Sequence, residues 1–180
     1  MSIEFTGLDE AELFLRNLGK TSRTIFSNTL NELANSAEKK AVGLITTELN
    51  LDEPFAKSKF SIDKSDAKTL TAKVSTPKKG LLLSHFEAEQ LWENKQGKRN
   101  RTGVRVKVKQ NKKTIKKAFM LKGKNGKQLV AIRQGKGKNN FKVLYGPSTS
   151  QAFDTFHDPL EQEMFDDFEK IFAQELSSIL

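Results

Sequence analysis

The sequence has no cysteine and no long apolar run, and each absence excludes a class of protein. Without cysteine the chain has no disulfides, no thiolate nucleophile and no cysteine-based zinc site, so its stability must come from packing and assembly. No apolar run approaches the roughly 20 residues that a membrane-spanning helix needs. The start of the chain also lacks the basic-then-apolar pattern of a secretion signal. We therefore expect a soluble protein that is made in the cytoplasm.

Acidic residues are missing from one long stretch of the chain. Residues 94–153 contain 18 Lys or Arg and no Asp or Glu, and we call them the basic block. Residues 154–180 contain eight acidic residues and one basic residue, while residues 1–93 are nearly balanced. The net charge of +9 therefore hides a strongly basic middle and an acidic end.

Apolar residues recur at helical spacing near both ends of the chain. Asp9–Leu18 has such a stripe and stops at Gly19, a favoured residue just past a helix end. Ser22–Leu49 predicts a long helix, and Asp158-Pro159 is typical of the first residues of another. The apolar face of the long helix comprises Phe26, Leu30, Leu33, Ala37, Ala41, Leu44 and Leu49. The face of the last helix comprises Leu160, Met164, Phe168, Ile171, Phe172 and Ile179.

The middle of the chain alternates apolar and polar residues, as half-buried strands do. The predicted strands are 60–62, 70–74, 104–108, 119–121, 128–133 and 141–145. Asn125-Gly126 and the segment around Gly135 and Gly137 indicate turns. Leu81–Leu83 fits either a strand or the start of a short helix that ends near Trp92. Lys95–Thr102 has no apolar residue and predicts a mobile loop.

These elements predict an α+β fold in which an antiparallel sheet of about five strands is packed by a long N-terminal helix and by C-terminal helices. The length fits a single domain over residues 1–180. In that domain residues 1–50 form the N-terminal helices, residues 55–146 the sheet with the basic block, and residues 147–180 the C-terminal helices.

No set of residues predicts catalysis, a metal site or a cofactor. His85 and His157 lie far apart and lack neighbours at metal-ligand spacing, so solvated or core-edge histidines are favoured. Ser148 lacks the G-x-S-x-G pattern of a nucleophile, and a turn or helix-capping role is favoured. The Gly/Lys-rich segments 122–127 and 135–138 lack phosphate-loop spacing, so they indicate hairpin turns. Asp166, Asp167 and Glu169 indicate the wet face of a helix. We expect no enzyme.

Two motif blocks of this chain resemble the phage and prophage minor tail protein Z family. The first runs from Leu82 to Gln90 and continues into Gly103–Val108. The second contains Ala118-Phe119, the Asn125-Gly126 turn, Arg133, the run Leu144 to Ser148 and Gln151–Phe153. Both blocks occur in the family's order and spacing, and the resemblance covers roughly residues 21–153. The family-motif residues are Phe86, Gly103, Val104, Phe119, Arg133, Tyr145, Gly146, Pro147, Ser148 and Phe153.

The resemblance implies a virion protein that completes the head-proximal end of a long phage tail, at the neck where heads and tails join. It implies a ring around the DNA path, for which a hexamer would match the symmetry of a tail. Expected partners are other copies of this chain, tail tube or terminator proteins, head-tail connector proteins and the tape-measure protein. Assembly is expected in the cytoplasm of the bacterial host, with no membrane involved.

The basic block leaves three interpretations open. It is a solubilising surface, a sequence-independent contact for DNA phosphates, or a surface that faces the acidic end of a neighbouring copy. Burial of Val104, Val106 and Val108 would turn the alternating cations to the other face of their strand. The candidates for facing DNA or the tail lumen are Lys98, Arg99, Arg101, Arg105, Lys107 and Lys109. The alternative function is a stand-alone nucleic-acid-binding protein.

Overall fold

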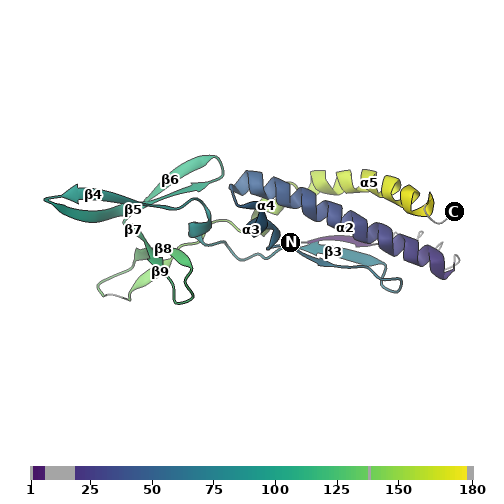
Figure 1. Cartoon of the computed structure of the whole chain (residues 1–180), viewed down its shortest axis with the longest axis horizontal. Coiled ribbons are helices and arrows are strands. Elements are labelled where there is room, and N and C mark those ends of the chain that lie inside the picture. The colour runs from purple at the N-terminus through teal and green to yellow at the C-terminus, as the bar shows by residue number, and fades with distance from the viewer. Residues whose placement is uncertain (1, 7–18, 138, 178–180) are drawn as a thin grey trace.

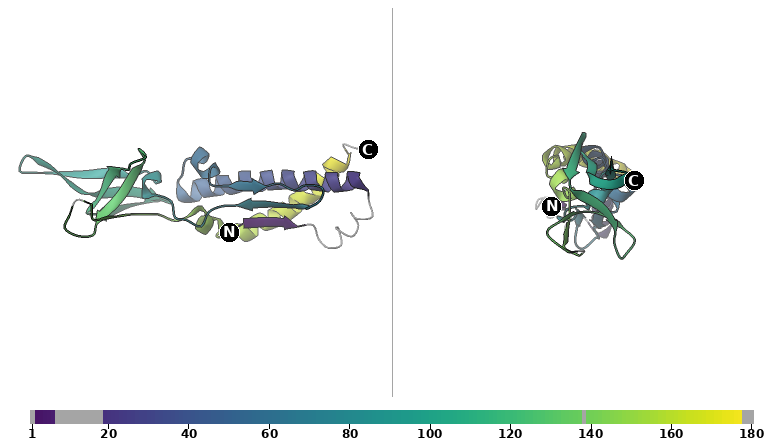
Figure 2. Two further views of the ribbon diagram at one scale, coloured as in Figure 1. Left: turned by 90° about the horizontal axis from the view of Figure 1, so that it is seen from below. Right: turned by 90° about the vertical axis from the view of Figure 1, so that its left-hand side faces the viewer.

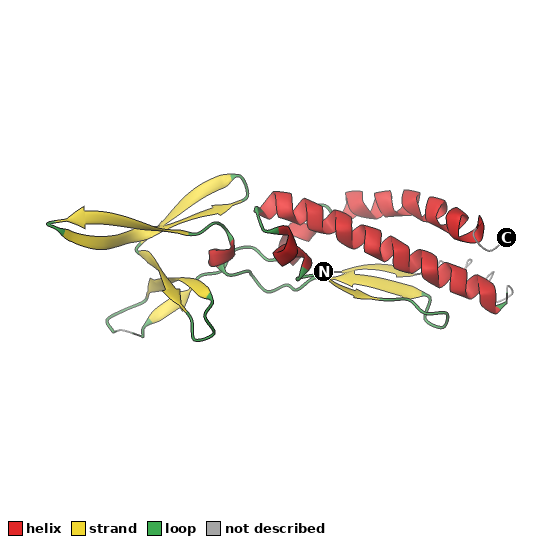
Figure 3. Ribbon diagram, viewed as in Figure 1, coloured by secondary structure: helices red, strands yellow, loops and turns green. Residues whose placement is uncertain are grey.

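The computed structural model describes residues 2–6, 19–137 and 139–177, and the chain is elongated (Figure 1). Two long helices and one three-stranded sheet form one half, which we call the helical half. Two further three-stranded sheets form the other half, which we call the sheet half (Figure 3). Both ends of the sequence contribute to the helical half, and the middle of the sequence forms the sheet half.

The helical half is built on α2 (Lys20–Leu49), which runs beside α5 (His157–Ser177) and over a sheet (Figure 2). That sheet has the antiparallel order β1-β3-β2, with β1 at Ser2–Thr6, β2 at Ser61–Asp63 and β3 at Thr71–Ser75. Two short helices, α3 (Glu53–Lys57) and α4 (Thr149–Phe153), complete this half.

The long helix agrees with the sequence prediction, with one difference on its apolar face. Leu44 is 41% exposed, whereas Ile45 is fully buried. Ile45 follows Ala41 by four residues and precedes Leu49 by four, so it continues the buried stripe that Leu44 leaves. Asn50 ends the helix in the left-handed conformation, with φ of 54°. The helix predicted at Asp9–Leu18 and the residue Ile179 lie outside the described residues.

Aromatic side chains join the two long helices. The ring of Phe26 on α2 lies edge-on to Phe168 of α5 at 5.7 Å and to Phe172 at 6.3 Å between centroids. Lys40 adds ion pairs across the same interface, at 2.6 Å to Glu163 and 2.8 Å to Asp167. The C-terminal helix is therefore fixed along α2 by both apolar and charged contacts.

The sheet half contains two antiparallel sheets. The first has the order β4-β5-β6, with β4 at Glu89–Lys95, β5 at Lys98–Val108 and β6 at Asn111–Lys116. The second has the order β7-β8-β9, with β7 at Ala118–Lys122, β8 at Gln128–Arg133 and β9 at Phe141–Val143. The α+β class and the long terminal helices are therefore as predicted, but the described strands form three small sheets in place of one sheet of about five.

Two local predictions are wrong. The segment Lys95–Thr102 is the end of a β-hairpin, in which Gln96 and Gly97 have φ of 51° and 75° and so form a tight turn. Of the two alternatives for Leu81–Leu83, the helix that ends near Trp92 is wrong, because Leu83–His85 is a single 3-10 turn and the chain then enters β4. Leu82 forms an isolated β-bridge, as a strand residue would. Residues 92–102 are all exposed, and a strand without a buried face shows no apolar alternation in the sequence.

Among the described helices, none combines the length and the apolar character that a bilayer crossing requires.

Candidate functional site

Two antiparallel segments of the chain join the halves, and we call residues 77–86 and 144–147 the connector. Gly146 N–H donates to the Leu81 carbonyl at 2.8 Å, and Leu81 N–H donates to the Pro147 carbonyl at 3.2 Å. Leu82 and Tyr145 form an isolated β-bridge between the same segments. The outgoing and returning chains are therefore held together as they pass between the halves.

The connector is packed around Phe86. This ring is fully buried, and a Cβ added to Gly146 would lie 2.7 Å from Phe86 Cε2 and 3.2 Å from Leu83 Cδ2. Only a glycine lets the returning segment approach the ring this closely. Gly146 of the second motif block and Phe86 of the first thus contact each other, although they are far apart in the sequence.

The last residues of the second motif block, Ser148 and Gln151–Phe153, begin the return to the helical half. Ser148 is the N-cap of α4: its hydroxyl accepts from Gln151 N–H, and the Gln151 side chain accepts from Ser148 N–H, both at 3.0 Å. Phe153, at the other end of α4, is buried and lies edge-on to Phe60 at 6.2 Å. The predicted capping role of Ser148 is therefore what the structure shows.

The upstream motif joins the two sheets of the sheet half. The side chain of Gln90 donates to the Gly103 carbonyl on β5 and accepts from Met120 N–H on β7, both at 2.8 Å. Gly103 lies close to β6, since a Cβ there would be 2.7 Å from the Ile115 carbonyl oxygen. Val104 is fully buried beside it. These motif positions hold strands together.

Two motif residues lie at the surface of the sheet half. The guanidinium of Arg133 lies 5.5 Å from the centre of the Phe119 ring and also donates to the Gly137 carbonyl at 2.7 Å. Phe119 is itself edge-on to Phe141 at 6.2 Å. Tyr145 differs from these residues because it is 52% exposed on the connector. It is the motif residue whose ring is most available to a partner.

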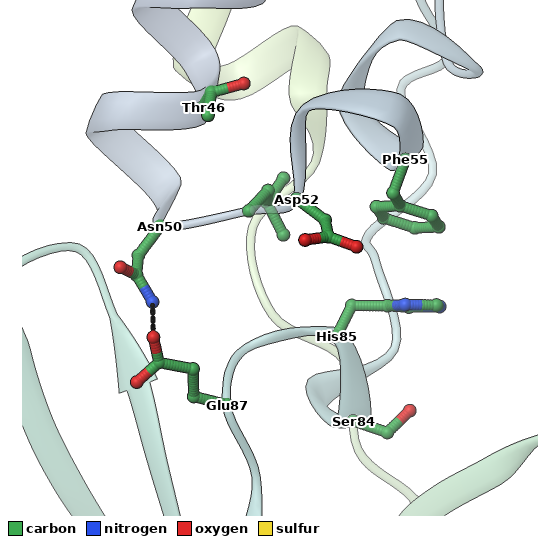
Figure 4. Close-up of a pocket in the computed structure, with 8 residues that line it drawn as sticks. Thr46, Asn50, Asp52, Phe55, Ser84, His85 and Glu87 are labelled. Carbon is green, nitrogen blue, oxygen red and sulfur yellow. Dashed lines mark hydrogen bonds between the residues drawn. The ribbon is translucent and has the colours of Figure 1, made fainter.

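A pocket lies where the end of α2 meets the connector (Figure 4). His85 stacks on Phe55 at 3.8 Å, and Asn50 donates to Glu87 at 2.9 Å. The hydrogen bond from Asn50 holds the pKa of Glu87 below its usual value, while burial lowers the pKa of His85. These contacts brace the helical half against the sheet half. The pocket is lined by Thr46, Asn50, Leu51, Asp52, Phe55, Ser84, His85 and Glu87.

The strand cations of the predicted DNA-facing set are placed as the alternation indicates. Val104 and Val106 are buried and Val108 is half-buried, while Arg105 and Lys107 lie on the opposite face of β5. Each of these cations also lies near a carboxylate. Arg105 is 3.5 Å from Glu89, and Lys107 is 3.8 Å from Glu87. Lys109 lies in the turn after β5 and forms an ion pair with Glu48 of α2.

The hairpin cations do not share that face. Trp92 pairs with Arg101, whereas Leu91 pairs with Gly103, so Thr102 is an extra residue that bulges from β5. Glu89 and Trp92 project to opposite faces of β4, and therefore so do their partners Arg105 and Arg101. The bulge places Arg99 and Arg101 against Trp92, with guanidinium carbons 4.4 and 5.3 Å from the ring centre. Lys98 pairs with Lys95 at the tip.

His157 has closer neighbours than its sequence position suggested. Its Nδ1 lies 3.0 Å from Asp158 and 3.9 Å from Glu161, and the three side chains gather at the start of α5. Both carboxylates are exposed, and they lie at the start of α5, where negative charge is favourable. That the chain binds no metal stays a prediction.

The fold and these surfaces define an elongated α+β protein whose long axis separates a basic end from an acidic end. Its motif residues mainly hold the connector and sheets in place. Residues 5–180 match the family model for prophage minor tail protein Z (GPZ), so the chain belongs to that family. It is therefore a structural tail protein and a component of the virion. The chain has no match among curated proteins or among solved structures.

Proposed function

We propose that this protein completes the head-proximal end of a long phage tail and acts there as a ring around the DNA path. Family membership supports the tail setting. The observation that carries the ring is the charge separation along the long axis: the basic block forms most of the sheet half, and acidic α5 lies in the helical half (Figure 1). Unlike ends on one subunit favour head-to-tail contacts, which close into a ring when the rotation allows.

Loss of the protein tests the tail-completion role. A phage that lacks it should form heads and tails that are poorly joined or non-infectious, which electron microscopy of the lysate would reveal. Normal yields of infectious particles from the null phage would overturn the proposal.

Self-assembly is tested by light scattering at increasing salt. We expect rings or ladders of subunits that weaken as salt rises, because exposed charges lose much of their reach beyond about 10 Å at about 0.1 M salt. A strict monomer at high concentration and low salt would contradict the ring formed by this chain alone.

The alternative function is sequence-independent binding of nucleic acid, and the cations of β5 and its hairpin favour it. The bulge divides them into two sets that can be tested separately. One triple variant changes Lys98, Arg99 and Arg101 to Gln, and the other changes Arg105, Lys107 and Lys109 to Gln. Duplex DNA binding at low salt, with the fold checked by circular dichroism, should fall for the set that faces phosphates. If neither variant loses affinity for DNA, these six cations do not contribute to DNA binding.

A further inference from the structure

Within the described part of the chain, no other segment covers the hairpin formed by residues 92–102. All of its residues are exposed, and it projects from the far end of the sheet half (Figure 1). A two-stranded hairpin is only marginally stable in water by itself. At its base, Trp92 is 42% exposed, and the guanidiniums of Arg99 and Arg101 pack against its ring. Trp and Arg, together with Tyr, are enriched among the residues that contribute most binding energy in protein interfaces.

A complementary surface lies on the outer face of α5. Phe165 is 59% exposed, the most exposed large apolar side chain of the described residues. Glu161 and Glu169 lie four positions before and after it, so they flank the ring on the same helix face. Glu161 is 3.9 Å from His157, and no ion pair is found for Glu169 within the described ranges. This surface is an aromatic ring flanked by carboxylates, and the hairpin carries an aromatic ring packed against two guanidiniums.

One copy cannot join its own two surfaces. The hairpin lies at the free end of the sheet half, and α5 lies in the helical half beyond the connector (Figures 1 and 2). The complementary charges therefore fit contact between two copies. Contact of this kind joins different patches of identical chains, so it repeats from one copy to the next.

We propose that the Trp92 hairpin of one copy docks on the Phe165 face of α5 in the next copy, with Arg99 and Arg101 facing Glu161 and Glu169. This inference rests on the ring proposed above, and it names the surfaces that form it. Burial of Trp92 and Phe165 supplies the apolar contribution, and the charged groups fix the direction of the contact. Docking buries hairpin residues that are exposed in the single copy.

Charge reversal tests the docking. One variant carries Arg99→Glu and Arg101→Glu, and a second carries Glu161→Lys and Glu169→Lys. In each variant alone, the hairpin and the α5 face carry charges of the same sign and repel each other. Its self-association, measured by sedimentation at low salt, should be weaker by roughly tenfold or more. A mixture of the two presents opposite charges at every contact, so assemblies should return. A control for the first variant, Lys136→Glu in the β8–β9 loop with Lys142→Glu on β9, makes the same change in net charge as Arg99→Glu with Arg101→Glu and should assemble normally.

Cysteine cross-linking tests the geometry, and the natural absence of cysteine makes any disulfide specific. Asn94→Cys lies on the same hairpin face as Trp92, and Gln162→Cys lies one helical turn before Phe165. Mild oxidation of the mixed variants should give cross-linked dimers, and the chain with both changes should give ladders. Lys136→Cys paired with Gln162→Cys should give neither.

The outcomes separate the two proposals. If the wild-type chain never associates, both the ring and the docking fail. If the wild type associates and the charge-reversal variants associate equally well, only the docking fails. If Arg99→Glu with Arg101→Glu abolishes DNA binding and leaves association unchanged, the hairpin is a nucleic-acid contact and the docking is overturned.

Discussion

The two halves of this protein reach an ordered structure by different means. In the helical half, long amphipathic helices and a small sheet enclose a core that includes Phe26, Leu30, Phe153 and Met164, all at most 4% exposed. In the sheet half, two thin sheets are held by a few buried residues, such as Val104 and Val130, and by side-chain bridges such as Gln90. A core stabilises the first half, whereas the second half depends more on cross-links between strands.

The largest effect is expected from the core of the helical half. Phe153→Ala should lower the free energy of unfolding by roughly 3–5 kcal/mol, because it removes a fully buried ring. The matched control is Phe165→Ala on the exposed face of α5, which should stay within about 0.5 kcal/mol. Urea unfolding in salt high enough to keep the chain monomeric is the measurement. Equal losses for both variants would contradict the distinction between buried and exposed faces of the helical half.

The connector should be the next most sensitive region. Gly146→Ala places a methyl group against the buried Phe86 ring and should cost roughly 1–3 kcal/mol through overpacking. Gly43→Ala in α2 is the control, since a Cβ there meets nothing within 4 Å. That change should stabilise the helix by about 0.5–1 kcal/mol. Opposite signs in thermal unfolding would confirm that Gly146 is required by close packing. A neutral Gly146→Ala would show that the connector yields without cost.

A smaller effect is expected at the N-cap of α4. Ser148→Ala removes the hydroxyl that accepts from Gln151 N–H and should cost about 1 kcal/mol. Gln151→Ala removes only the reciprocal contact and should cost less. The double variant measures the coupling of the capping box. Strictly additive losses in urea unfolding would mean that the two contacts act independently.

The smallest effect is pH-dependent and lies between α2 and α5. The hydrogen bond from Lys40 lowers the pKa of Asp167 below its ordinary value of 3.8. The pKa of Lys40 is raised, because its hydrogen bonds to Asp167 and Glu163 outweigh the lowering by burial. Since the folded-state pKa of Asp167 is depressed, its stabilising effect is present above the ordinary pKa and is lost as pH falls through the folded-state pKa.

Substitution of Lys40 tests this effect. Lys40→Gln should flatten the dependence of the urea midpoint on pH below about pH 4, where aspartate begins to take up protons. Lys39→Gln, at the exposed neighbouring position, should leave that dependence unchanged. An acid limb that is identical in wild type and Lys40→Gln would show that this pair does not link stability to pH.

The helical half was more predictable than the sheet half for a physical reason. A helix that buries one face has apolar residues at helical spacing in its sequence, as Phe26, Leu30 and Leu33 show. Strand β6 buries little, because Ile115 is its one half-buried residue and the others are exposed. Its lysine-rich sequence therefore shows no apolar alternation. Strand β1 was also missed, although Ile3 and Phe5 alternate with polar residues.

The candidate surfaces could also be predicted only in part from the sequence. The alternation of valines correctly indicated which way Arg105 and Lys107 project. The bulge at Thr102 depends on how β4 and β5 pair, and no single-strand pattern reveals that pairing. Trp92 was overlooked because it precedes the basic block by two residues. Recognition of Gln96-Gly97 as a hairpin turn would have brought Trp92 opposite the arginines.

The connector has a consequence for the order of events during synthesis. The chain leaves the helical half, forms the sheet half and returns. Helix α5, which packs along α2, is therefore synthesised long after α2. Lys40 and Asp167 are 127 residues apart. The strand pairs of the sheet half are nearly all local hairpins, which form quickly. On the ribosome, the sheet half can therefore fold while the part of the apolar stripe of α2 that α5 covers is still exposed. That stripe must be kept from aggregating until the last helix emerges.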